Sequence, residues 1–221
     1  MISLFRVLGV AAALCAVSGT VAGQGHDAQL VAAAARGDAL AVADALNAGA
    51  AVDARGAGEA TALLLATHGN HVAAAKVLID AGADVNAKDR IQDSPYLYAG
   101  ARGHDEILQM TLAHGADLKS TNRYGGTALI PAAERGHVQT VRLLIAAGVD
   151  VNHVNNLDWT ALLEAVLLGD GGPSHVAIVQ ALIAAGADVN LPDGQGVTAL
   201  AHARQKGYDD MVRVLTQARA R

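Results

Sequence analysis

The chain of 221 residues has a single cysteine, Cys15, and only 3% aromatic residues. One cysteine cannot form an internal disulfide, so the fold depends on packing alone. So few aromatic side chains give no platform on which the bases of single-stranded nucleic acid would stack. The net charge is −5 and the basic residues form no tract, which makes nucleic acid and anionic membrane surfaces unsuitable partners.

The first 23 residues have the layout of a secretory signal peptide. Residues 1–6 carry one positive charge, residues 7–17 form an uncharged apolar run, and residues 18–23 are small or polar. The apolar run is too short to cross a bilayer comfortably, and this three-part order is typical of a cleaved signal. We expect cleavage after Ala22 or Gly23 and a periplasmic or secreted mature chain without membrane association. An uncleaved membrane anchor is the alternative.

A period of 33 residues runs through the rest of the chain. Hydroxyl residues recur 33 residues apart, with a last step of 38, at Thr61, Ser94, Thr127, Thr160 and Thr198. Glycines keep the same period at Gly49, Gly82, Gly115, Gly148 and Gly186. A period of this length predicts stacked helix pairs. Threonine and serine are N-cap residues, so each is expected to open a helix that buries its apolar face against neighbouring units.

Aligned on this period, the units read GTALIPAAERGHVQTVRLLIAAGVDVNH and variants of it. This pattern resembles the ankyrin repeat, which has the form G-x-T-P-L-H-x-A-A-x-x-G-H, a second helix and then G-A-D-V-N. The resemblance implies an all-α solenoid of about six helix-turn-helix repeats over residues 24–221, with finger loops between successive repeats. We expect a monomer with repeats at residues 27–54, 55–87, 88–120, 121–153, 154–190 and 191–221, the first and last acting as caps.

The chain departs from the ankyrin pattern in two places. The histidine that usually follows T-P-L is replaced in every unit, by Leu64, Leu97, Ile130, Leu163 and Ala201. We therefore expect the hydrogen bonds from that histidine to the finger loops to be missing, and the loops to be looser. The last step is longer because residues 170–174 are inserted between the two helices of one unit. This insertion either belongs to a binding face or reflects drift in a tolerant loop.

No group of residues has the spacing of a catalytic or metal site. Four of the nine histidines share one repeat position, at His71, His104, His137 and His175. Stacked helices lie about 10 Å apart, which is too far for equivalent side chains to converge on one metal ion. The sequence contains no phosphate-binding glycine loop, no G-x-S-x-G and no H-E-x-x-H motif. We expect no metal, no cofactor and no enzymatic activity.

The resemblance also implies where a partner binds, because ankyrin repeats usually bind other proteins in the concave groove between finger loops and first helices. Those positions give the candidate partner-binding residues Arg90, Ile91, Tyr98, Arg102, Arg123, Tyr124, Arg135, Leu157, Trp159, Glu164 and Leu168. Ile91, Tyr124 and Leu157 form an apolar stripe across three loops, beside the only tryptophan. Four arginines flank the stripe and are suited to a partner's carboxylates.

We interpret the chain as a non-enzymatic protein-binding module of the periplasm that inhibits, protects or scaffolds one partner protein. The alanine- and glycine-rich composition favours a bacterial source. Secreted bacterial ankyrin proteins of this build resemble accessory partners in catalase-linked peroxide defence, or immunity proteins that cap a toxin. The alternative is an exported ankyrin effector that acts on a host protein.

Overall fold

The computed structural model describes residues 17–220, so residues 1–16 of the predicted signal peptide lie outside the described part. The first helices of the repeats are α1 (Val17–Arg36), α3 (Ala62–His68), α5 (Pro95–Arg102), α7 (Leu129–Glu134), α9 (Ala161–Leu167) and α11 (Ala199–Lys206). The second helices are α2 (Ala39–Asn47), α4 (Val72–Asp80), α6 (Asp105–Ala113), α8 (Val138–Ala147), α10 (Pro173–Ala184) and α12 (Asp209–Gln217). A short 3₁₀ turn, η1 (Ala57–Glu59), lies in the first finger loop.

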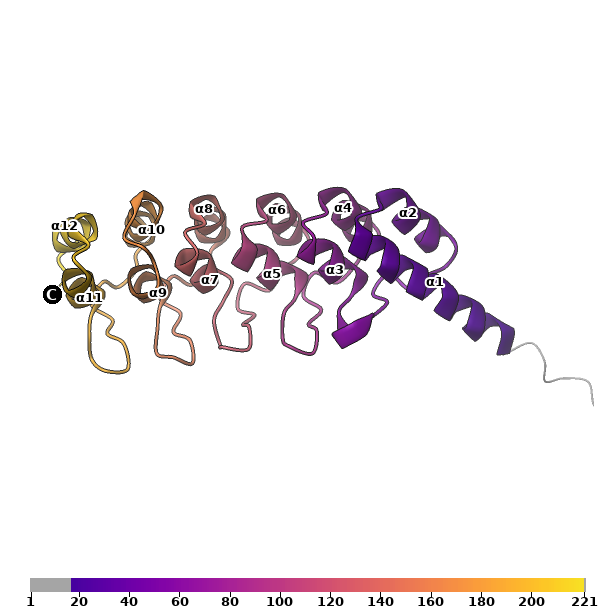
Figure 1. Ribbon diagram of the computed structural model, residues 1–221, viewed down its shortest axis with the longest axis horizontal. Coiled ribbons are helices and arrows are strands. Elements are labelled where there is room, and N and C mark those ends of the chain that lie inside the picture. Colours follow the sequence, from indigo (N-terminus) through magenta and orange to yellow (C-terminus); the bar gives the residue numbers. More distant parts are fainter. Residues whose placement is uncertain (1–16, 221) are drawn as a thin grey trace, which may run out of the picture.

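The helices form two layers (Figure 1). The second helices make one layer, the first helices make the other, and the finger loops project from the first-helix side. α1 is the longest helix described and extends beyond the end of the stack. Across residues 17–220 the only β pairing is an isolated bridge between Arg55 and Thr61, which confirms the all-α prediction. No helix in this part of the chain has the length and apolar character needed to span a membrane.

Side-chain caps open the first helices, as the period predicts. The hydroxyl oxygen accepts a 3.2 Å hydrogen bond from the N–H three residues further on at Thr61, Ser94 and Thr160. This bond satisfies a donor that the helix itself leaves unpaired. The prediction is wrong at Thr127, whose buried hydroxyl has no hydrogen-bond partner. There the Ile130 N–H donates to the Thr127 backbone carbonyl instead, a tight turn of the 3₁₀ type, and α7 begins at Leu129.

The core lies between the two helix layers and between successive repeats. Each of five first helices has one fully buried alanine in the same register, at Ala66, Ala99, Ala132, Ala165 and Ala203. These small residues let neighbouring first helices approach closely. The second helices supply large side chains that are fully inaccessible, among them Leu78, Leu108, Leu144, Leu182 and Leu215. Full burial of one such side chain contributes about 1.5–3 kcal/mol, so apolar packing within and between repeats is the main source of stability.

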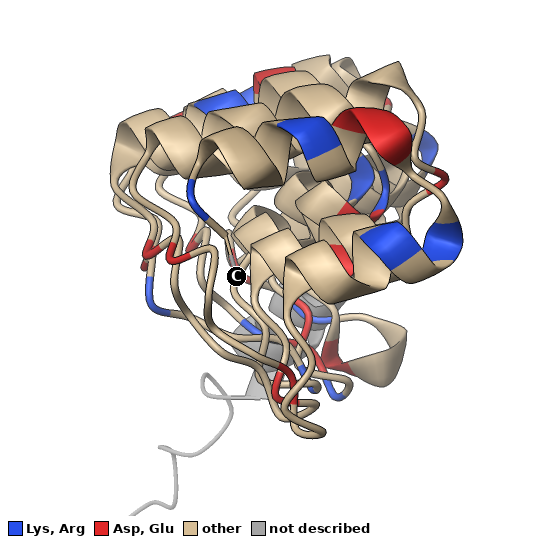
Figure 2. Ribbon diagram, turned by 90° about the vertical axis from the view of Figure 1, so that its left-hand side faces the viewer, with Lys and Arg blue, Asp and Glu red and all other residues tan. Residues whose placement is uncertain are grey.

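The periodic aspartates and histidines have structural roles in the turns. The Oδ1 atoms of Asp84, Asp117, Asp150 and Asp188 accept hydrogen bonds of 2.8–3.0 Å from the backbone two residues on. Acidic residues consequently recur in register along the stacked loops (Figure 2). The His137 ring lies against the turn of the preceding repeat, where Gly103 has a φ of +71° and a Cβ would come within 2.9 Å of the ring. Burial lowers the pKa of His137 and His104, so both favour the neutral, packed form.

The inserted residues 170–174 pack against the last repeat. Asp170 Oδ1 accepts a 2.8 Å hydrogen bond from the Gly172 N–H, and Pro173 then opens α10. The Tyr208 hydroxyl donates to the Gly169 carbonyl at 2.9 Å. The insertion is therefore held by contacts within its own repeat and with the next one.

Candidate functional site

Four finger loops are closed by an aspartate or asparagine in the same register: Asp89, Asn122, Asn155 and Asp193. In each, the side-chain Oδ1 accepts hydrogen bonds of 2.9–3.1 Å from the N–H groups two and four residues on. These Asx turns fix the loop backbone locally. In the last two loops a first-helix side chain also reaches the closing residue, Glu164 at Asn155 and His202 at Asp193. These bonds do not come from the position of the absent histidine, which is Leu163 or Ala201, but from the residue that follows it.

The residue two positions after each closing side chain stands at the tip of the loop. Its backbone N–H is engaged in the Asx turn, whereas its side chain points outward. The apolar stripe occupies this position, with exposed fractions of 52% for Ile91, 53% for Tyr124 and 51% for Leu157. Three exposed apolar side chains on adjacent loops are typical of a contact surface.

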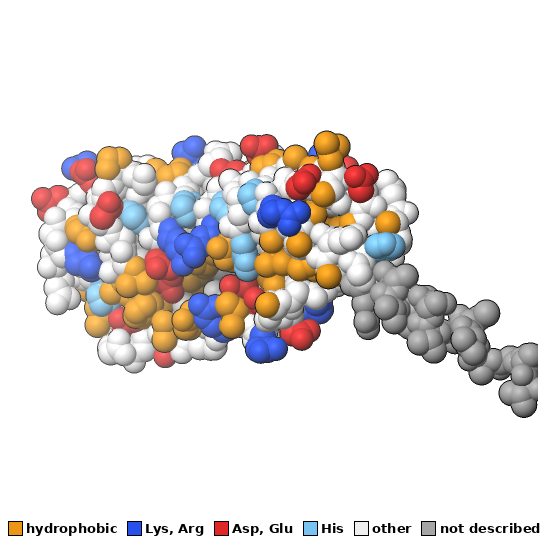
Figure 3. Space-filling model, turned by 45° about the vertical axis from the view of Figure 1, so that its right-hand side comes forward, with side chains coloured by type: hydrophobic (Ala, Val, Ile, Leu, Met, Phe, Trp, Pro, Cys, Tyr) orange, Lys and Arg blue, Asp and Glu red, His pale blue; other side chains and the backbone are white. Residues whose placement is uncertain are grey.

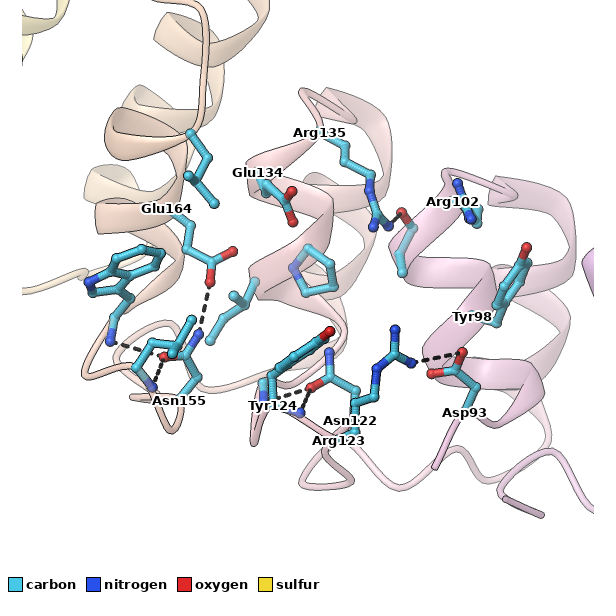
Figure 4. A pocket seen from close by; sticks show the side chains of 17 residues that line it. Asp93, Tyr98, Arg102, Asn122, Arg123, Tyr124, Glu134, Arg135, Asn155 and Glu164 are labelled. Atoms are coloured by element: carbon cyan, nitrogen blue, oxygen red, sulfur yellow. Dashed lines mark hydrogen bonds and ion pairs between the residues drawn. The ribbon is translucent and has the colours of Figure 1, made fainter. Parts of the chain in front are cut away.

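A groove lies beside the stripe, between α5, α7 and α9 and the finger loops that precede these three helices (Figure 4). Its cavity volume is about 240 Å³. The space-filling view shows hydrophobic side chains intermixed with basic, acidic and histidine side chains along the hollow between helices and loops (Figure 3). The side chains of α5, α7 and α9 form one wall of the groove, and the loop residues form the other.

The groove brings together nine of the eleven candidate residues, namely Tyr98, Arg102, Arg123, Tyr124, Arg135, Leu157, Trp159, Glu164 and Leu168. Arg90 and Ile91 do not line it, although Asp93 of the same finger loop does, and both are exposed. Lining residues absent from the candidate set include Asn122, Pro131, Glu134 and Asn155. Pro131 has the same register in α7 as Tyr98 in α5, so the repeat alignment alone would have identified it.

The groove arginines already have partners within the chain. The Arg123 guanidinium lies 4.8 Å from the centre of the Tyr124 ring and 3.8 Å from the Asp93 carboxylate. Arg135 donates from Nη1 to the Ala101 carbonyl at 2.6 Å. Arg102 lies 5.4 Å from the centre of the Tyr98 ring. The expected arginines are therefore present, but Arg123 and Arg135 are held against a neighbouring loop or helix, and Arg102 lies against Tyr98 of its own helix.

Two carboxylates on neighbouring helices face the same part of the groove, Glu164 on α9 and Glu134 on α7 (Figure 4). Glu164 is only 5% exposed and accepts a 2.8 Å hydrogen bond from Asn155 Nδ2. Burial, reinforced by the negative charge of Glu134, raises the pKa of Glu164 to about 7. Within residues 17–220, neither carboxylate has a cation within ion-pairing distance. The groove thus contains a buried acid that has no ion-pair partner among the described residues and whose charge is only partly offset by the more distant Arg135.

The chain is similar to known proteins over most of its length. A family model described as ankyrin repeats (3 copies) matches residues 30–122 and residues 96–193. The crystal structure of an ankyrin repeat domain from Acinetobacter baumannii AYE is 60% identical, with a TM-score of 0.84 over 87% of this chain and 98% of that one. The ankyrin repeat protein EF0377 is 44% identical, with a TM-score of 0.83 over 86% of this chain and 96% of the other.

A more distant similarity extends to the ankyrin repeat domain of Bcl-3, a member of the IkappaB protein family. That domain is 28% identical, with a TM-score of 0.78 over 87% of this chain and 86% of its own length. A comparison with curated protein sequences gave no match.

Proposed function

Because the chain belongs to the ankyrin-repeat family, whose domains are protein–protein interaction modules, we propose that it binds one partner protein through the groove and the apolar stripe. The proposed role is that of a non-enzymatic periplasmic or secreted module that inhibits, protects or scaffolds its partner. Partners of the kind suggested by the sequence are a peroxide-defence enzyme or a toxin.

The observation that supports this proposal is the exposure of large apolar side chains on rigidly closed loops. Tyr124 and Leu157 are each about half exposed and line the groove. Leu168, at the end of α9, is also 51% exposed and lines the same groove. Exposed apolar side chains gain free energy when a partner removes them from water, and aromatic and arginine side chains are the usual anchors of interfaces.

Replacing Leu157 with alanine should weaken capture of the partner by about tenfold or more, because it removes an exposed apolar contact at the groove edge. Tyr124→Ala should act in the same direction. The measurement is cross-linking and affinity capture from an envelope extract, followed by titration of the captured protein. Leu40→Ala is the matched control, because Leu40 is 81% exposed on α2, outside the groove. Equal capture by all three variants would assign binding to another surface.

The proposed compartment has its own test. We expect the mature protein to be recovered from the envelope fraction with a new N-terminus between residues 20 and 25, since the small-residue segment ends there. Sequencing the N-terminus of protein from each cell fraction gives the answer. Intact Met1 in cytosolic protein would contradict the periplasmic proposal. The second candidate function, an exported effector that acts on a host protein, requires the processed chain in the culture medium instead.

A further inference from the structure

The last two described repeats differ in the charges at one equivalent contact, the contact between the first helix and the residue that closes the finger loop. In the final repeat, the His202 side chain of α11 lies 2.7 Å from the Asp193 carboxylate, which closes the finger loop. In the repeat before it, the acid is on the helix and the loop residue is neutral, so Glu164 faces only the Asn155 amide. Asp193 therefore has a basic partner in its own repeat, whereas the equally buried Glu164 has none.

Among the described residues, no cationic side chain of the groove forms an ion pair with Glu164, and Arg135 only partly offsets its charge from a distance. Arg135 is directed to the Ala101 carbonyl, and Arg123 is paired with Asp93. Glu134 adds a second negative charge on the facing helix. A buried carboxylate without an ion-pair partner is unfavourable in a low-dielectric setting, and a basic group that enters the groove would relieve this cost.

The groove walls suit the rest of a basic side chain. Tyr124, Trp159 and Leu157 line the groove together with both carboxylates. The methylene stem of an arginine or lysine buries well against such apolar walls while its charged end stays polar, and a guanidinium also binds aromatic faces. A carboxylate from a partner would instead meet Glu134 and Glu164 at the centre of the groove, which like charges disfavour.

We propose that the groove receives an arginine or lysine side chain from an apolar segment of the partner, with its cationic group between Glu134 and Glu164. This inference rests on the proposed function and names the chemistry of the segment that the groove recognises. It reverses the expectation from sequence, because the central contact is a cation on the partner and the arginines of this chain are left at the margin.

The test uses three acetylated and amidated pentapeptides, Leu-Ala-Xaa-Ala-Leu, in which the central residue is arginine, its neutral analogue citrulline, or glutamate. Binding to the full-length protein is followed by the fluorescence of Trp159, the only tryptophan, and by amide chemical shifts in NMR. The arginine peptide should bind about tenfold more tightly than the citrulline peptide, in the range expected for a charge contact in a partly buried site. The glutamate peptide should bind least.

Glu164→Gln keeps the shape of the side chain and should remove most of this preference, while Glu106→Gln, an exposed acid on α6, should keep it. A wild-type protein that binds the citrulline or glutamate peptide as tightly as the arginine peptide would overturn the inference. So would an unchanged preference in Glu164→Gln, or the absence of any saturable response. Failure of the wider proposal has a separate readout, because it depends on capture of the natural partner by Leu157→Ala.

Discussion

The Glu164→Gln variant should be more stable than the wild-type protein by about 3 kcal/mol at pH 8, because one pKa unit corresponds to about 1.4 kcal/mol. The pKa of the carboxyl is raised from its ordinary value of 4.5 in the unfolded chain to about 7 in the groove. Since the folded state binds this proton more tightly than the unfolded chain, the ionised group lowers stability above pH 7. This loss shrinks as the pH falls from 7 and disappears below 4.5.

Urea unfolding of both proteins at pH 5 and pH 8 measures this effect. The difference in free energy of unfolding should be large at pH 8 and much smaller at pH 5, and it isolates Glu164 from the histidines, which titrate equally in both proteins. Glu106→Gln serves as the control, because an exposed acid should change stability by less than about 0.5 kcal/mol. Equal stability of wild type and Glu164→Gln at pH 8 would mean that water or local rearrangement already relieves the buried charge.

Replacing Leu144 with alanine should lower the free energy of unfolding by about 2–5 kcal/mol, the range for a cavity in a packed core. Leu144 is completely inaccessible in α8. α8 packs against α6, α7 and α10, so the cavity would open where two successive repeats meet. In a stacked array each repeat is stabilised mainly by its neighbours, and the damage should therefore spread to both.

Chemical denaturation with circular dichroism measures this loss. Leu143→Ala is the matched control, since it removes the same atoms from the adjacent residue, which is only partly buried. Its effect should be clearly smaller. A similar loss for both variants would indicate that the two helix layers are packed less tightly around α8 than the accessibility of Leu144 implies.

The 33-residue period predicted most of the fold. Hydroxyl caps such as Ser94 and stops such as Gly103 act through local backbone geometry, so sequence alone could place them. Thr127 behaves differently because Pro131, four residues on, has no N–H to donate to the Thr127 carbonyl, and the Ile130 N–H donates to it instead. The proline within this unit was therefore the signal of the change. Candidate residues chosen by their position in the period were also predicted well, because nine of them line one groove.

The electrostatics of the groove could not be predicted in this way. The raised pKa of Glu164 depends first on burial and then on Glu134, which lies thirty residues earlier and comes close only through the stacking of α7 on α9. The engagement of Arg135 with the Ala101 carbonyl likewise joins two different repeats. The sequence identified these charged groups but not which of them interact. Their interactions depend on the directions in which side chains of neighbouring repeats point, and the order of residues within one repeat does not determine those directions.

The Asx turns of the finger loops separate the shape of each loop from the identity of the residue at its tip. The closing side chain holds the backbone through main-chain N–H groups, so isoleucine, tyrosine, leucine and glutamine all occupy the same tip position, at Ile91, Tyr124, Leu157 and Gln195. Substitutions at these sites change the side chain that a loop presents while the loop backbone stays intact. Under the proposed function, recognition can therefore diverge one loop at a time without a change in the fold.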